Sequence, residues 1–167
     1  MDVPYHGPDA SLLAVCRCES LAARGPGGQH ANRNATGVRL QFKLPDGETL
    51  VAVADNERSH ARNQAAALRQ MRLQLACHLR GLSDPEWLRP HRHGRRLRVS
   101  AGARDLHLVA AVLLDALDDA EGQPSSAARA LDLGSRQFVG GLTCDKRLWQ
   151  AAQQLRERHG LGPLRTP

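Results

Sequence analysis

Apolar and polar residues alternate along three short stretches in the first half of the chain. Every second residue of 38–43 is apolar, residues 49–54 form a second strand-like run, and the Pro-Asp-Gly sequence between them predicts a tight turn. Residues 15–21 alternate as well, and we expect Cys16 and Cys18 to face inward. The pattern predicts a small antiparallel sheet.

A helical period follows the predicted sheet. From about Glu57 to Arg80 apolar residues recur at the spacing of one helix face, and Gly81 stands where a helix commonly ends. The residues of this face are Ala61, Ala65, Leu68, Leu75 and Leu79. At 1.5 Å per residue the helix would span roughly 36 Å, which is long enough to cover the sheet. We expect most of its arginines to be exposed to solvent.

The second half of the chain has helical periodicity throughout. Helices are predicted over about 106–120, 125–131, 135–142 and 145–160, with Ser125, Ser135 and Asp145 as expected N-caps. The two middle helices and their glycine turn fit a helix-turn-helix, and a plain helical hairpin explains the same pattern. Within them Gly140 and Gly141 would each cost a recognition helix about 1 kcal/mol relative to alanine. The candidate nucleic-acid contacts of this half are Arg129, Arg136 and Arg147.

These elements predict an α+β chain. A small antiparallel sheet with one long packing helix comes first, and a small all-α helical bundle follows. We expect a first domain over residues 1–81, an Arg-rich linker over 82–104 and a helical domain over 105–167. The length of 167 residues leaves room for one moderate and one small domain.

Positive charge favours an anionic partner. The formal net charge is +6, and Lys43 and Lys146 are the only lysines, so arginine, which suits bidentate phosphate contacts, carries nearly all of the positive charge. The stretch from Arg89 to Arg104 has no carboxylate and contains Arg89, Arg92, Arg95, Arg96, Arg98 and Arg104. It fits either a solvated loop or an RNA-contacting segment, and Arg92, Arg95 and Arg96 are its main candidates.

Several classes of protein are disfavoured by composition. No run approaches the 18 apolar residues of a membrane span, and the first residues lack the charged and apolar regions of a signal peptide, so we expect a cytoplasmic chain that makes no membrane contact. The four cysteines are too scattered for a disulfide framework or a zinc site. We expect neither a metal nor a cofactor.

The segment from Arg24 to Arg39, RGPGGQHANRNATGVR, carries the candidate chemistry. Its glycines follow neither the P-loop nor the dinucleotide-binding spacing, and no carboxylate lies between Glu19 and Asp46. Glycines allow close backbone approach, while amide and guanidinium groups favour a phosphate-rich partner. A plain surface turn has the same glycine content.

The order of elements from Gly25 to Leu79 resembles the peptidyl-tRNA hydrolase domain of the bacterial peptide-chain release factor family. The sequence GPGGQHANR is followed by a strand ending in LPDG, a second strand and the helix NERSHARNQAAALRQMRLQL. Because the GGQ sequence, the strand spacing and the opening of the helix all match together, the resemblance is specific.

The resemblance implies roles for individual residues. Gly27, Gly28 and Gln29 would be catalytic, with the Gln29 backbone amide facing the reacting ester. Gly25, Pro26, His30 and Asn32 would support the loop. From the residues themselves we expect RNA contacts at Arg33 and Arg39 of the glycine-rich segment, and at Arg58 and Arg62 in the first turns of the predicted helix, near the sheet edge. The implied partners are the ribosome, with its rRNA and P-site peptidyl-tRNA, and a glutamine methyltransferase acting on Gln29. We expect the protein to be a monomer.

Departures from the family narrow the expected function. Decoding release factors carry stop-codon-reading domains ahead of this one, whereas little sequence precedes the first predicted strand here. Rescue factors of the family end in a basic tail, whereas this chain ends RERHGLGPLRTP after a helical region. We expect codon-independent, ribosome-dependent hydrolysis of the peptidyl-tRNA ester, as in ribosome rescue. A non-catalytic ribosome- or RNA-binding factor is the alternative, and a helix-turn-helix DNA binder is a third hypothesis.

Overall fold

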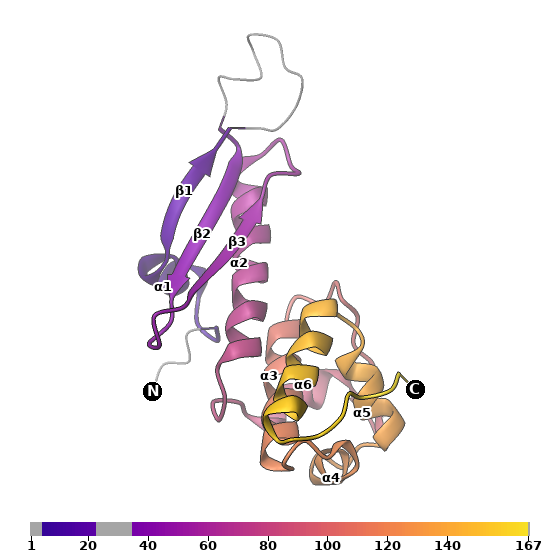
Figure 1. The fold of residues 1–167 in the computed structure, drawn as a ribbon. Helices are drawn as coiled ribbons and strands as arrows, with labels where there is room; N and C mark the ends of the chain where they lie inside the picture. The colour runs from indigo at the N-terminus through magenta and orange to yellow at the C-terminus, as the bar shows by residue number, and fades with distance from the viewer. Residues whose placement is uncertain (1–4, 23–34, 167) are drawn as a thin grey trace. The chain divides into compact units, whose positions relative to one another are not determined.

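A computed structural model of the chain describes residues 5–22 and 35–166 (Figure 1). The chain divides into two compact units, Met1–Leu75 and Ala76–Pro167. The boundary between them falls inside the long helix α2, His60–His78. Residues 82–104, which the sequence analysis treats as a linker, contribute regular elements to the second unit. Each unit is described by itself below.

The first unit contains the predicted three-stranded sheet. Its strands β1 (Arg17–Leu21), β2 (Gly37–Lys43) and β3 (Thr49–Ala54) are antiparallel, in the order β1-β2-β3. The turn between β2 and β3 is closed by hydrogen bonds between Leu44 and Glu48 and between Gly47 and Leu44. Gly47 has φ +94°, a conformation that glycine adopts without steric cost, so the predicted turn is confirmed.

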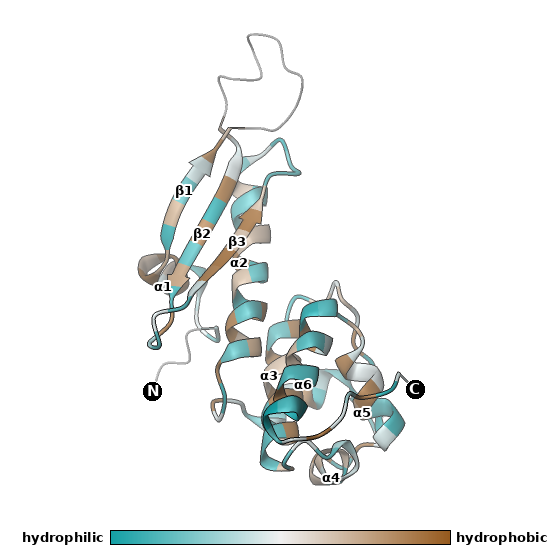
Figure 2. Ribbon diagram, in the orientation of Figure 1, coloured by the Kyte–Doolittle hydropathy of each residue, from teal (hydrophilic) through white to brown (hydrophobic). Residues whose placement is uncertain are grey.

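Apolar side chains of β2, β3 and α2 form the core of the first unit. Figure 2 shows the hydropathy of the residues along these elements. Val38, Leu40 and Ala52 of the sheet are buried, as are Met71 and Leu75 of α2. The prediction that Cys18 faces inward is only half right. Cys18 pairs with buried Leu40 and therefore shares its side of the sheet, yet it is exposed because β1 is an edge strand.

One arginine of α2 has a structural role that was not expected from the sequence. Arg72 donates to the backbone oxygens of Tyr5 and Gly7 over 2.9 and 2.7 Å, and pairs with Asp9 at 2.8 Å. Asp9 opens the short helix α1, Asp9–Val15. Only 11% of the Arg72 side chain is exposed, so this arginine fastens the segment before α1 to the long helix.

The second unit is built around α3, Leu106–Asp119. Ten of its residues are buried, including Val109, Leu113 and Leu117. Packed with it are α4 (Pro124–Ala130), α5 (Ser135–Leu142) and α6 (Lys146–Arg158). The preceding segment adds a 3-10 helix, η2 (Pro85–His91), and a hairpin of β4 (Arg92–His93) and β5 (Arg96–Leu97). The hairpin was not predicted, because its strands are too short to show alternation.

The helix caps were predicted with mixed success. The Asp145 side chain accepts a hydrogen bond from the backbone N–H of Arg147 over 2.7 Å, so its role as N-cap of α6 is confirmed. Ser125 and Ser135 are not caps, because Gln123 and Gly134 occupy the N-cap positions of α4 and α5. The predicted α+β class is confirmed by the sheet and the helices together.

Candidate functional site

The glycine-rich segment lies largely outside the described residues. Of the residues predicted to act or to support the loop, Gly25, Pro26, Gly27, Gly28, Gln29, His30 and Asn32 are outside, as is Arg33. The structure does describe the strands on either side of the segment. Leu21 at the end of β1 pairs with Gly37 at the start of β2, so the two ends of the segment are held side by side. This pair lies at one end of the sheet.

Gly37 stands where the segment enters β2, and it has little room for a side chain. A Cβ atom there would lie 3.1 Å from both Cβ and the backbone oxygen of Leu21 and 3.2 Å from Cβ of Asp55. These distances are tighter than ordinary van der Waals contact, and the backbone oxygen is fixed by strand pairing. Glycine therefore favours the close approach of β1 and β2 at this end of the sheet.

Asn63 fastens the same place to the start of α2. Its side-chain amide donates to the backbone oxygens of Thr36 and Glu57 over 2.7 and 2.8 Å, and its Oδ1 accepts from the Glu57 N–H over 3.0 Å. The residue is 1% exposed. A buried amide that makes three hydrogen bonds to backbone fixes the position of that backbone. Asn63 was not predicted from the sequence, because the apolar face assigned to the helix runs through Ala61, which is exposed, and Ala65, whereas Asn63 lies on another side of the helix.

A further contact joins α2 to the end of β1. Ser20 Oγ and His60 Nε2 lie 3.4 Å apart, within hydrogen-bond distance. Four pieces of chain thus converge at one end of the sheet: the end of β1, the start of β2, residues 55–59 and the first turn of α2. This convergence, which we call the loop base, lies where the described chain leads into and out of residues 23–34.

Three predicted RNA-binding arginines lie on the described part of the first unit. Arg62 is 77% exposed and pairs loosely with Glu57 at 3.6 Å, and Arg58 is also exposed. Both belong to the segment that Asn63 links to Thr36, so they are close to the loop base along the chain. Arg39 lies within β2 and pairs with Glu19 at 3.6 Å across the strands, with 39% of its side chain exposed.

The predicted RNA-binding arginines of the second unit are not equivalent. Arg92 donates to Gly94 O over 3.0 Å and pairs with Asp132, and the largely exposed Arg95 lies 3.9 Å from the same carboxylate. Asp132 belongs to the turn between α4 and α5, so the carboxylate that the Arg-rich sequence lacks comes from a distant residue. Arg96 is exposed and has no ion-pair partner among the described residues. Arg92 is thus partly structural, while Arg96 is available to a ligand.

Cys16, Cys77 and Cys144 do not offer reactive thiolates at neutral pH. Burial raises the pKa of Cys77 to about 12, and it raises the pKa values of Cys16 and Cys144 to about 11. Thiols with such pKa values stay protonated, and the thiolate is the form that attacks substrates and binds metals. Within residues 5–22 and 35–166, no three His, Cys, Asp or Glu side chains gather into a group that could hold a metal ion. No helix in these ranges is long and apolar enough to cross a membrane.

Comparisons with known proteins identify the first half of the chain. The RF-1 domain model matches residues 14–97. Over 88 residues the chain is 34% identical to peptide chain release factor 1 of Rhodospirillum rubrum, a match that covers 53% of this chain and 23% of the relative. The chain thus spans less than a quarter of that relative. No solved structure matches the chain.

Proposed function

Since the chain belongs to the RF-1 domain family, we propose that it hydrolyses the ester between peptide and tRNA on the ribosome, through Gly27, Gly28 and Gln29. The observation that carries the proposal is the position of GPGGQ inside the matched residues 14–97, between two paired strands. The loop base, with Gly37 and Asn63, would hold the ends of the GGQ segment so that it projects into a crowded RNA site.

The residues of the segment suit hydrolysis without a strong base. Ester hydrolysis needs a water held against the carbonyl carbon and stabilisation of the negative charge that develops on oxygen. A backbone N–H can supply the stabilisation, and we assign that role to Gln29, with its side chain ordering the water. Gly27 and Gly28 would permit the required backbone path. Because no carboxylate lies between Glu19 and Asp46 and we assign His30 to loop support, proton transfer would fall to the RNA, and the isolated protein would be a poor esterase.

We propose further that the reaction does not depend on a stop codon and serves ribosome rescue. In this proposal the second unit takes part in recruitment. Exposed arginines there, such as Arg96, support contacts to RNA phosphates. Arg58 and Arg62 of the first unit would contact RNA beside the loop base.

The test is release of labelled peptide from ribosomes that carry peptidyl-tRNA. Three complexes are compared: a truncated mRNA, a stop codon and a full-length sense mRNA. We expect the wild type to release peptide most rapidly on the truncated mRNA, and Gly28→Ala to abolish nearly all release. Gly102→Ala is the matched control, because Gly102 lies in open space without a left-handed backbone.

Other outcomes would change the proposal in defined ways. Release by Gly28→Ala at the wild-type rate would remove the assigned role of the GGQ segment. Strongest release on the stop codon would contradict codon independence. Ribosome binding with no release on any complex would favour the non-catalytic binding factor.

A further inference from the structure

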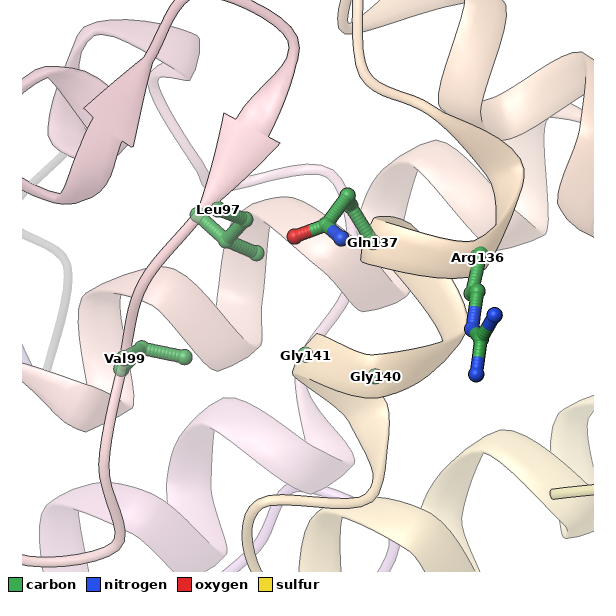
Figure 3. Close-up of a pocket in the computed structure, with 6 residues that line it drawn as sticks. All are labelled: Leu97, Val99, Arg136, Gln137, Gly140 and Gly141. Atoms are coloured by element: carbon green, nitrogen blue, oxygen red, sulfur yellow. The ribbon is translucent and has the colours of Figure 1, made fainter. Parts of the chain in front are cut away.

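A small pocket opens in the second unit between α5 and residues 97–99, which include the end of β5 (Figure 3). It encloses about 290 Å³ and is lined by Leu97, Val99, Arg136, Gln137, Gly140 and Gly141. In Figure 3 the side chains of Leu97 and Val99 point towards α5, and that of Gln137 points back towards Leu97. We call this the α5 pocket.

The two glycines of α5 have different roles in shaping the pocket. A Cβ on Gly141 would lie 2.7 Å from Cδ2 of Leu97 and 3.0 Å from Cδ1 of Leu113, so this glycine allows α5 to pack closely. A Cβ on Gly140 would meet nothing within 4 Å. Packing therefore explains why residue 141 is a glycine, but it does not explain why residue 140 is one. The missing side chain at Gly140 leaves the pocket open.

The lining combines an apolar surface with two groups available for binding. Leu97 is buried and Val99 is half-buried, so Val99 supplies most of the aliphatic surface that a ligand could reach. The Gln137 amide, which can both donate and accept, has no hydrogen-bond partner among the described residues. Arg136 is exposed and, within the described part of the chain, forms no ion pair.

The charge around the pocket favours an anionic ligand. None of the six lining residues is acidic. The exposed Arg96 and Arg98 alternate with Leu97 and Val99 along the chain, and residues 133–144 contain no carboxylate. A ligand with a flat apolar part and a nearby negative charge would satisfy every group of the lining.

We propose that the α5 pocket binds one unpaired nucleotide of an RNA. The base lies against Leu97 and Val99, the Gln137 amide hydrogen-bonds to its edge, and Arg136 contacts an adjacent phosphate. Unpaired bases are commonly recognised in this way, by apolar contact on the face and hydrogen bonds on the edge. The volume suits a single base, since it lies at the lower end of the range for small-molecule pockets. The inference rests on the proposed function in taking RNA as the partner.

The first test fills the pocket without disturbing the fold. Gly140→Leu places a side chain into the open space, while Gly162→Leu adds the same side chain at another open glycine that does not line the pocket. Binding of the full chain to fluorescent single-stranded RNA homopolymers is measured by anisotropy at fixed salt. We expect Gly140→Leu to weaken binding at least about tenfold, the order of one lost base contact, with an unchanged or higher Tm. Gly162→Leu should bind like the wild type.

The salt dependence of binding separates the base contact from the phosphate contact. Gly140→Leu removes no charge, so the slope of log affinity against log salt should stay unchanged. Arg136→Gln should lower affinity and reduce the slope by about 0.7, the value for one phosphate contact to a single strand. Gln137→Ala should flatten the preference among poly(U), poly(A) and poly(C).

The outcomes can be read independently of peptide release. Wild-type affinity of Gly140→Leu for RNA would overturn the inference even if the wild type released peptide. Loss of RNA affinity in Gly140→Leu would support it even if no peptide release occurred. Binding restricted to duplex DNA would overturn it, because a paired base cannot enter the pocket.

Discussion

The side-chain amide of Asn63 donates to the backbone oxygen of Thr36 over 2.7 Å, and this bond links the start of α2 to the entrance of β2. Thr36 lies directly before β2, and in the sequence residues 22–35, which include GGQ, separate it from β1. The same amide donates to Glu57 O, and its oxygen accepts from Glu57 N–H. One buried side chain thus couples two backbone segments at the loop base.

Replacing Asn63 should destabilise the first unit. In Asn63→Ala the backbone groups of Thr36 and Glu57 lose their partners in a partly buried place, which costs about 1–3 kcal/mol. Asn63→Asp keeps the accepted hydrogen bond and loses both donated ones, so the protein should be no more stable with Asn63→Asp than with Asn63→Ala. The free energy of unfolding is measured in urea. The control is Asn56→Ala, since Asn56 is exposed, and it should change that free energy little. Equal stability of the Asn63 and Asn56 variants would contradict the coupling.

Asp115 should be equally important in the second unit. Its carboxylate accepts from the N–H groups of Leu82 and Ser83 over 3.1 and 3.0 Å and pairs with Arg80 at 3.1 Å. The side chains of Arg80 and Asp115 are 16% and 9% exposed. Asp115→Ala leaves a nearly buried cation and two N–H groups unpaired, and we expect a loss of about 3 kcal/mol in unfolding free energy.

The matched control for Asp115 is Asp119→Ala, because Asp119 is an exposed carboxylate on the same helix. Its effect should be within about 0.5 kcal/mol. The double variant Arg80→Met, Asp115→Leu removes both charges and should recover part of the loss. A double variant less stable than Asp115→Ala would show that the ion pair is not the source of the effect.

Local pattern was enough to predict the strands and most helices, since strand alternation and the helical period are properties of neighbouring residues. The contacts at the loop base were not predictable in this way. Asn63 and Thr36 are 27 residues apart in the sequence, and Arg92 and Asp132 are 40 residues apart. The pattern of neighbouring residues therefore predicts neither contact. The Arg-rich segment resembled a linker because its compact structure depends on such distant contacts. Exposure of Cys18 depends on the position of β1 at the sheet edge, which alternation does not report.

The adjacent glycines of α5 should respond to alanine in opposite directions. Gly140→Ala meets open space and removes backbone freedom from the unfolded chain, so it should stabilise the protein by about 0.5–1 kcal/mol. Gly141→Ala forces Leu97 and Leu113 to shift and should destabilise it by about 1–3 kcal/mol. The free energy of unfolding of both variants is measured in urea. The same sign for both would contradict the packing of α5 described above.

Stability should fall at alkaline pH through the buried thiols. Burial raises the pKa of Cys77 from 9.0 to about 12, so the folded state keeps a proton that the unfolded state loses. The stabilisation linked to this proton is complete below pH 9 and is lost as the pH rises from about 9 towards 12. Unfolding free energies of the wild type and Cys77→Ala are compared at pH 7 and at pH 10. Cys77→Ala costs the same packing energy at both pH values. The difference in unfolding free energy between the wild type and Cys77→Ala should therefore be smaller at pH 10 than at pH 7. A gap that stayed constant would show that the Cys77 thiol has the same pKa in both states.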